Sequence, residues 1–311
     1  MYASAPLAQI LHCLYNKRHH MGHTSDVRRF AMETCMLQSM LLGLDGSAYS
    51  AAAMALGIRW AQHCSATLVG LGIVDEPTIC HHEAVPLGGS YYKHERDARR
   101  LEEAHQKVAG FLADFATACE TAHIVYTVSQ EVGTPSERLL RATPRYDVVL
   151  FGQQTYFHFE TQEAPCDTLE QVLKHGPRPV VAVPEQPVTG STAVIAYDGS
   201  LQAARALQTF QSLGLYDVYE LHVVSVHHDQ PTATQQVEEA CAFLGFHKIT
   251  AIPHPVMSSA APSEVLLEYV KTHPGLLVMG AYGGSAFVEY FLGSATRTLL
   301  TESPVPVFLS H

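Results

Sequence analysis

The chain has 311 residues, 47% of them hydrophobic, which is enough to bury two cores of ordinary domain size. No apolar run approaches the roughly 18 residues that a membrane-spanning helix needs, and the formal net charge of −11 disfavours nucleic acid and anionic membranes as partners. The seven cysteines are scattered, odd in number and without a C-x-x-C pair, which argues against a disulfide framework or a zinc ribbon. A reducing cytoplasm is the compartment that fits this cysteine usage.

Residues 1–35 form an N-terminal extension of uncertain status. They lack a charged start followed by an apolar core and so do not resemble a secretory signal. We expect a flexible or partly helical extension. Met32 and Met36 are alternative starts, because the first strand begins near Leu37.

The next part of the chain alternates between apolar runs and helical patterns. A strand ends at Asp45-Gly46-Ser47, and the alanine-rich residues 48–61 are predicted to form a crossover helix. Apolar residues recur at three- and four-residue spacing over 96–119, which predicts a second helix. Strands are predicted at 147–152 and 179–183. Such alternation indicates βαβ units and a mostly parallel sheet with helices on both faces.

The second half repeats this pattern. A strand again ends in Asp-Gly-Ser, at residues 198–200, and a helix is predicted over 201–213. Residues 262–267 repeat the sequence character of 135–140, and further strands are predicted at 275–280 and 305–309. Prolines cluster between the two copies and mark a junction near residues 184–190. Two tandem domains are therefore predicted, over residues 36–187 and 188–311.

A glycine-rich segment follows the strand at 275–280. It has the spacing G-x2-G-x9-G-S, from Gly280 and Gly283 to Gly293-Ser294, and leads into a helical segment at 295–300. A buried strand, a glycine loop and a helix start form the layout of a phosphate cradle, because glycines allow close approach and helix N-termini bind anions. The alternative, that the glycines only turn the chain, stays open on spacing alone.

This spacing, followed by the closing strand, resembles the nucleotide-binding signature of the ATP-binding universal stress proteins. The Asp198-Gly199-Ser200 turn and the strand at 221–224 are also similar to that family, and the resemblance covers about residues 36–311. It implies two tandem doubly wound, mostly parallel five-stranded sheets of Rossmann-like α/β fold. It also implies an assembly of paired domains, with a homo-dimer or an unidentified protein as partner.

The resemblance further implies ATP as the ligand of the second domain. Asp198 would then lie on the ribose or metal side, where it is the candidate to hold Mg²⁺ through the phosphates, and the Val223 backbone would meet the adenine edge. The residues implied to cradle the phosphates are Gly280, Gly283, Gly293, Ser294 and, through its backbone N–H, Ala295. From the residues alone, Asp198-Gly199-Ser200 equally fits a turn with a helix cap, and Val223 equally fits a core position.

The first domain departs from this pattern. Gly152 closes its strand, but no second glycine follows over 153–160, and Cys166-Asp167 stands where the other copy has Gly293-Ser294. Asp167, with Glu160 and Glu163, would repel a phosphate. We therefore expect that the first domain has lost nucleotide binding, or binds something uncharged or cationic, and that one nucleotide binds per chain.

Other site chemistries have less support. The 19 histidines include the groups Cys80-His81-His82-Glu83, His227-His228 and His19 with His23, but adjacent histidines on a regular element point apart. No hydrolase, protease or P-loop motif is present. The sequence therefore predicts a cytoplasmic stress-response sensor or regulator that binds adenine nucleotide and is at most a slow ATPase. A nucleotide-free interaction or small-molecule-binding module, and a slow ATPase, are the alternatives.

Overall fold

The structure is a computed structural model, and it describes residues 35–81, 90–155, 157, 168–281 and 294–310. In the first half, the elements in chain order are β1 (Ser39–Leu44), α3 (Ala48–Cys64), β2 (Thr67–Val74), α4 (Glu76–Ile79), α5 (Ser90–Thr121), β3 (Tyr126–Val132), α6 (Pro135–Ala142), η2 (Thr143–Arg145), β4 (Val148–Gly152), α7 (Thr168–His175) and β5 (Val180–Val183). The second half contains β6 (Thr192–Ala196), α8 (Leu201–Leu213), η3 (Leu215–Val218), β7 (Glu220–His227), α9 (Gln230–Phe246), β8 (Ala251–Met257), α10 (Pro262–Thr272), β9 (Gly275–Gly280), α11 (Ser294–Glu302) and β10 (Val307–Ser310).

The strands form one ten-stranded sheet in the order β3-β2-β1-β4-β5-β10-β9-β6-β7-β8. Within each half the five strands are parallel. The predicted fold class is therefore confirmed. The sequence did not indicate that the two sheets join edge to edge, with β5 antiparallel to β10 and Val181 opposite Phe308.

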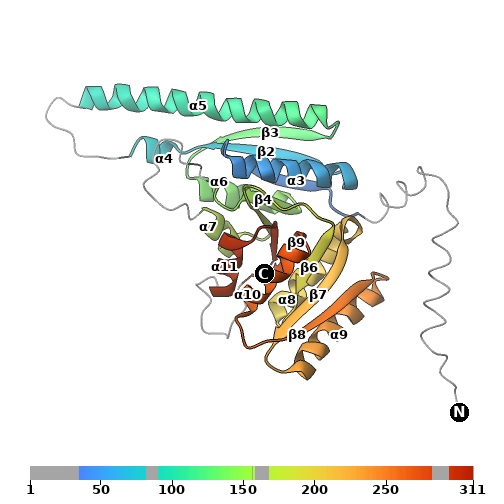
Figure 1. Cartoon of the computed structure of the whole chain (residues 1–311). Helices are drawn as coiled ribbons and strands as arrows, with labels where there is room; N and C mark the ends of the chain where they lie inside the picture. Colours follow the sequence, from blue (N-terminus) through green and yellow to red (C-terminus); the bar gives the residue numbers. More distant parts are fainter. Residues whose placement is uncertain (1–34, 82–89, 156, 158–167, 282–293, 311) are drawn as a thin grey trace, which may run out of the picture.

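Each face of the sheet carries a hydrophobic core that spans both halves. Helices α3, α5, α8 and α9 cover one face, and α6, α7, α10 and α11 cover the other (Figure 1). Trp60 and Phe210 are fully buried in the first core, and Phe151 and Phe157 in the second. Because strand residues alternate between the faces, Ile195 belongs to the first core and its neighbour Val194 to the second.

Polar contacts tie the two halves together beside the shared sheet. The hydroxyl of Tyr219 accepts hydrogen bonds from Trp60 Nε1 at 3.0 Å and from Arg59 Nη2 at 2.9 Å. Gln153 Nε2 donates to the backbone oxygen of Ser303 at 3.2 Å. The predicted junction near 184–190 lies in the segment between β5 and β6.

A disulfide joins Cys35, before β1, to Cys64, the last residue of α3. The cysteine spacing argued against disulfides, and this bond corrects that expectation for Cys35 and Cys64, because the packing of α3 brings two residues 29 positions apart together. Cys80, Cys119 and Cys241 are free thiols within the part of the chain that the structure describes. Across that same part, no helix combines the length and apolar character needed to cross a membrane.

Candidate functional site

A cavity of about 310 Å³ lies at the carboxyl end of the strands in the second half. It is located where β6 and β9 are neighbours, the point at which the strand order reverses. In open parallel α/β sheets, ligands bind in the crevice at such a switch point. The volume lies at the lower end of the range for small-molecule sites.

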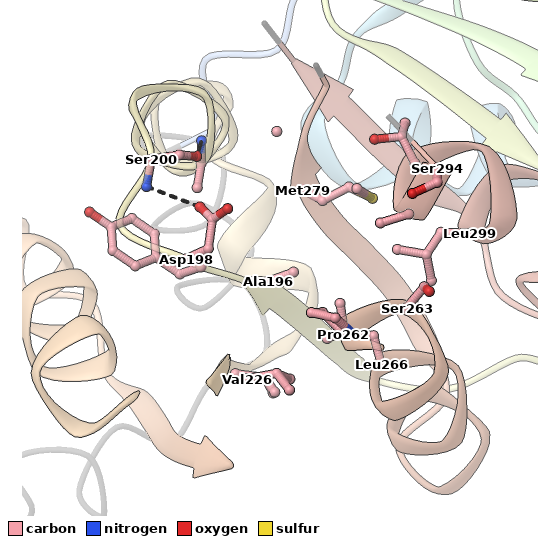
Figure 2. Close-up of a pocket in the computed structure, with 16 residues that line it drawn as sticks. Ala196, Asp198, Ser200, Val226, Pro262, Ser263, Leu266, Met279, Ser294 and Leu299 are labelled. Atoms are coloured by element: carbon pink, nitrogen blue, oxygen red, sulfur yellow. Dashed lines mark hydrogen bonds between the residues drawn. The ribbon is translucent and has the colours of Figure 1, made fainter. Parts of the chain in front are cut away.

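The floor of the cavity is apolar. Side chains from strands β6, β7 and β9 and from helices α8, α10 and α11 gather around one hollow (Figure 2). The apolar side chains that line it include Ala196, Val224, Val226, Leu266, Met279 and Leu299. Such a surface suits the flat, apolar faces of a heterocyclic base.

Three helices begin at the rim. Ser200 is the N-cap of α8, Ser263 lies in the first turn of α10, and Ser294 begins α11. Figure 2 shows these serines around the same hollow. The first N–H groups of a helix have no intrahelical acceptor and carry the positive end of the helix dipole, so this rim suits an anion.

Asp198 follows the end of β6 and is held by local geometry. Its Oδ1 accepts a hydrogen bond from the Ser200 backbone N–H at 3.0 Å, and the Ser200 hydroxyl accepts one from the Ala203 N–H at 3.1 Å (Figure 2). Gly199 between them has φ +75°, a conformation that glycine adopts without strain. The turn therefore presents one carboxylate at the cavity.

Gly280 is needed for close packing. A methyl group built at this glycine would lie 2.5 Å from the carbonyl carbon of Gln202 and 2.7 Å from the backbone nitrogen of Ala203. The end of β9 thus lies directly against the first turn of α8. Only glycine allows these two elements to approach so closely.

Four of the predicted site residues are brought together, since Asp198, Gly280, Ser294 and Ala295 all line the cavity. Gly283 and Gly293 lie outside the described residues, so the phosphate cradle between them stays a prediction. Val223 is fully buried in the core on the opposite face of the sheet, and its neighbours Val224 and Val226 line the cavity. A contact of the Val223 backbone with adenine also stays a prediction.

The charge around the cavity is sparse. Among its described lining residues there is no Lys, Arg or His, and Asp198 is the one carboxylate. Arg297, one turn into α11, is mostly exposed and lies 3.9 Å from Glu170 of α7. Anionic groups would therefore be held by backbone N–H groups and hydroxyls, while Asp198 could accept from a sugar hydroxyl or coordinate a hard cation such as Mg²⁺.

The matching place in the first half is filled. Asp45 there corresponds to Asp198, so Gly43 corresponds to the lining residue Ala196. A methyl group built at Gly43 would lie 2.6 Å from Phe151 Cε1 and 3.0 Å from Phe157 Cζ. Both rings are almost completely buried. Two aromatic rings thus lie in the first half beside the glycine that corresponds to the lining residue Ala196.

This filling gives a steric reason for the expected loss of ligand binding in the first domain. The sequence argument rested on Glu160, Glu163 and Asp167, which lie outside the described residues. The aromatic residue at 157 was part of a loop that offered no recognisable pattern. Only the packing against Gly43 reveals its place.

No group of three or more His, Cys, Asp or Glu side chains with metal-binding geometry occurs among the described residues.

A histidine cluster lies beneath α10, and the sequence analysis did not single it out. Nδ1 of His222 lies 2.9 Å from the Tyr269 hydroxyl, and the ring centroids of His254 and His273 lie 4.8 and 5.1 Å from that of His222. Burial first, and neighbouring histidines second, lower the pKa of His222 and of His254. From sequence, the cluster could have been suspected only by placing His222 and His254 on the same face of two neighbouring strands, β7 and β8.

Comparisons with known proteins agree with this architecture. No protein-family model matches the chain. The chain is 26% identical over 210 residues to a universal stress protein of Synechocystis sp., a match that covers 65% of this chain and 71% of that protein.

Two solved structures have the same fold over both halves of the chain. A universal stress protein from Archaeoglobus fulgidus matches with a TM-score of 0.62 at 21% identity, covering 88% of this chain and 98% of that one. A functionally unknown protein from Pseudomonas aeruginosa matches with a TM-score of 0.55 at 13% identity, covering 90% and 93%. The resemblance to tandem-domain universal stress proteins is therefore confirmed, in sequence by the Synechocystis relative and in fold, over both halves, by the Archaeoglobus structure.

Proposed function

We propose that the chain is a stress-response protein that binds ATP in the cavity between β6 and β9 and acts as a sensor or regulator. The observation that carries this proposal is the cavity itself, an apolar hollow whose rim consists of the first turns of three helices. An adenine ring suits the hollow, and phosphates suit the helix N-termini. The likeness to a curated universal stress protein supports the stress-response role.

The charges support the same ligand. The carboxylate of Asp198 would accept from the ribose or bind a Mg²⁺ that also contacts the phosphates, since Mg²⁺ prefers carboxylate and phosphate oxygens. No histidine or lysine lines the described part of the cavity to serve as a general base. Binding without rapid hydrolysis is thus the activity that the lining residues favour.

Calorimetric titration with ATP and Mg²⁺ tests the proposal. Ala196→Phe introduces an aromatic ring where Phe157 already fills the first half, so we expect it to abolish measurable binding. Val125→Phe, at an exposed residue just before β3 in the first half, is the matched control and is expected to bind as the wild type does. A wild-type chain that binds no ATP, or an Ala196→Phe variant that binds normally, would contradict the proposal.

Mass spectrometry of the purified native protein separates the proposal from a nucleotide-free interaction module. Adenine nucleotide that accompanies the wild type, and is missing from Ala196→Phe, is the expected result. A protein that neither retains nor binds adenine nucleotide would instead support the interaction module.

A further inference from the structure

One side chain connects the core of the second half to the turn that carries Asp198. Ser225, on β7, is almost completely buried, and its hydroxyl donates to Gln236 Oε1 at 2.5 Å. The other end of the same amide, Gln236 Nε2, donates to the backbone oxygen of Asp198 at 2.8 Å. Because a backbone oxygen can only accept, this contact fixes which end of the amide faces the turn.

The Gln236 side chain also lies against the glycine of the turn. Gly199 has φ +75°, and the atom nearest to a methyl group built on it would be Gln236 Nε2, at 3.4 Å. The side chain of Gln236 therefore lies against the turn at the point where the backbone reverses. A chain of hydrogen bonds thus runs from buried Ser225 through Gln236 to Asp198, and from Asp198 Oδ1 to the N-cap Ser200.

The first half of the chain lacks this connection. Its sheet register places Gly72 where β7 has Ser225, and a methyl group at Gly72 would lie 2.5 Å from Val108 of α5. The glycine that matches Gly199 is Gly46, and there the ring of Phe111 lies against it. In the first half, apolar contacts of Val108 and Phe111 take the place that the Gln236 amide has in the second half. The polar connection is therefore not a requirement of the fold and accompanies the open cavity.

We propose that Gln236 is a positioning residue for ligand binding, because it holds the Asp198-Gly199-Ser200 turn so that the carboxylate and the α8 N-terminus face the cavity. This inference rests on the proposed binding of ATP there. Gln236 is not among the described residues that line the cavity, and its hydrogen bond to Asp198 connects it to the turn that does.

The test separates positioning from a structural role. Gln236→Met keeps the length of the side chain but removes both hydrogen bonds, and we expect it to weaken ATP binding roughly tenfold, the scale of one or two lost hydrogen bonds. Gln235→Met is the matched control, since Gln235 is an exposed neighbour on α9 whose side chain donates to Glu239 Oε1, at 2.9 Å. It is expected to leave ATP affinity unchanged.

A double variant separates the effect of Gln236 on ATP affinity from its effect on stability. Gln236→Met alone leaves the buried Ser225 hydroxyl unpaired and lowers stability, whereas Ser225→Ala with Gln236→Met removes both partners and is expected to regain stability. ATP affinity is expected to remain about tenfold weak in the double variant, because the hydrogen bond from Gln236 to the Asp198 backbone oxygen is still missing. Affinity that returns together with stability, or Gln236→Met that binds ATP like Gln235→Met, would overturn the inference.

Amide hydrogen exchange in the ligand-free protein distinguishes failure of this inference from failure of the proposed function. Exchange over residues 198–200 is expected to be faster in Gln236→Met than in Gln235→Met, since the turn has lost its anchor. If the wild type binds no ATP, the proposed function fails. If exchange over the turn is the same in both variants, the positioning role fails whether or not ATP binds.

Discussion

Phe157 lies against Gly43 in the first half of the chain, at the position that corresponds to the cavity wall of the second half. The ring is completely buried in the core beneath α6 and α7. The two halves thus share one fold, but among the described residues aromatic rings lie in the first half at the place that corresponds to the cavity of the second. This difference between the two halves is the reason for assigning ligand binding to the second half.

Removing this ring is expected to cost stability. Phe157→Ala leaves a hole in a packed core, and we expect the free energy of unfolding to fall by about 3–5 kcal/mol. Phe246→Ala, at a side chain that is 87% exposed, is the control and is expected to change it by less than about 0.5 kcal/mol. Urea denaturation measures both. Equal effects of the two substitutions would show that Phe157 does not fill the first half.

Gly280→Ala is expected to push β9 away from α8, because the new methyl group would meet backbone atoms that cannot rotate aside. Overpacking of this kind costs about 1–3 kcal/mol of stability and is expected to weaken ATP binding as the cavity wall shifts. Gly110→Ala is the matched control on α5, where a methyl group has nothing within 4 Å. That variant is expected to gain about 1 kcal/mol, the helix propensity difference. Thermal unfolding and ATP titration measure both variants. The packing role of Gly280 is contradicted if Gly280→Ala has the same stability and ATP affinity as Gly110→Ala.

Asp198→Ala is expected to weaken ATP binding more in the presence of Mg²⁺ than in its absence, since the carboxylate is the candidate metal ligand. Turnover by the wild type is expected to be far below about 1 per second, a modest rate for an enzyme. A coupled phosphate-release assay checks this, alongside titrations with and without Mg²⁺. Hydrolysis at ordinary enzyme rates that is lost in Asp198→Ala would place the protein among the ATPases.

Acid is expected to destabilise the second half through its histidine cluster. Burial and neighbouring histidines hold the pKa values of His222 and His254 below their ordinary value of 6.5, while the Glu220 carboxylate opposes this for His222. Below about pH 6.5 the unfolded chain therefore binds more protons than the folded one, so stability is complete above that pH and falls as the pH falls.

The measurement is urea denaturation between pH 5 and pH 8. His254→Phe keeps an aromatic ring beside His222 but cannot be protonated, so we expect it to flatten the loss of stability on the acid side. The exposed His94→Phe on α5 is the control and is expected to leave that slope unchanged. An unchanged slope in His254→Phe would show that the cluster does not contribute to the pH dependence.

Much of the fold could be predicted because local patterns determine it. The periods of the apolar residues located several strands and helices closely, so that the predicted helix 201–213 and strand 275–280 coincide with α8 and β9. No range was predicted for β2, β3 or β8. The antiparallel contact of β5 with β10 could not be predicted, since both are short apolar closing strands with no marker of their partner. The disulfide between Cys35 and Cys64 was missed for the same reason, because it depends on tertiary packing alone.

The site was predicted in part. The Asp-Gly-Ser turn, Gly280 and the start of α11 carry local sequence signals, and all three lie at the cavity. The roles of Gln236 and Phe157 depend on contacts between segments far apart in the chain. A glutamine on a helix beside a second glutamine, and a phenylalanine in a loop, carry no pattern, so their contacts follow only from the three-dimensional structure.

A crystal structure of the full chain with ATP and Mg²⁺ tests the central claim most directly. We predict one nucleotide per chain, with its base on the apolar floor formed by Ala196, Val224 and Val226 and its phosphates at the N-terminus of α11. Nucleotide bound in the first half beside Gly43, or two equivalent nucleotides per chain, would contradict this assignment.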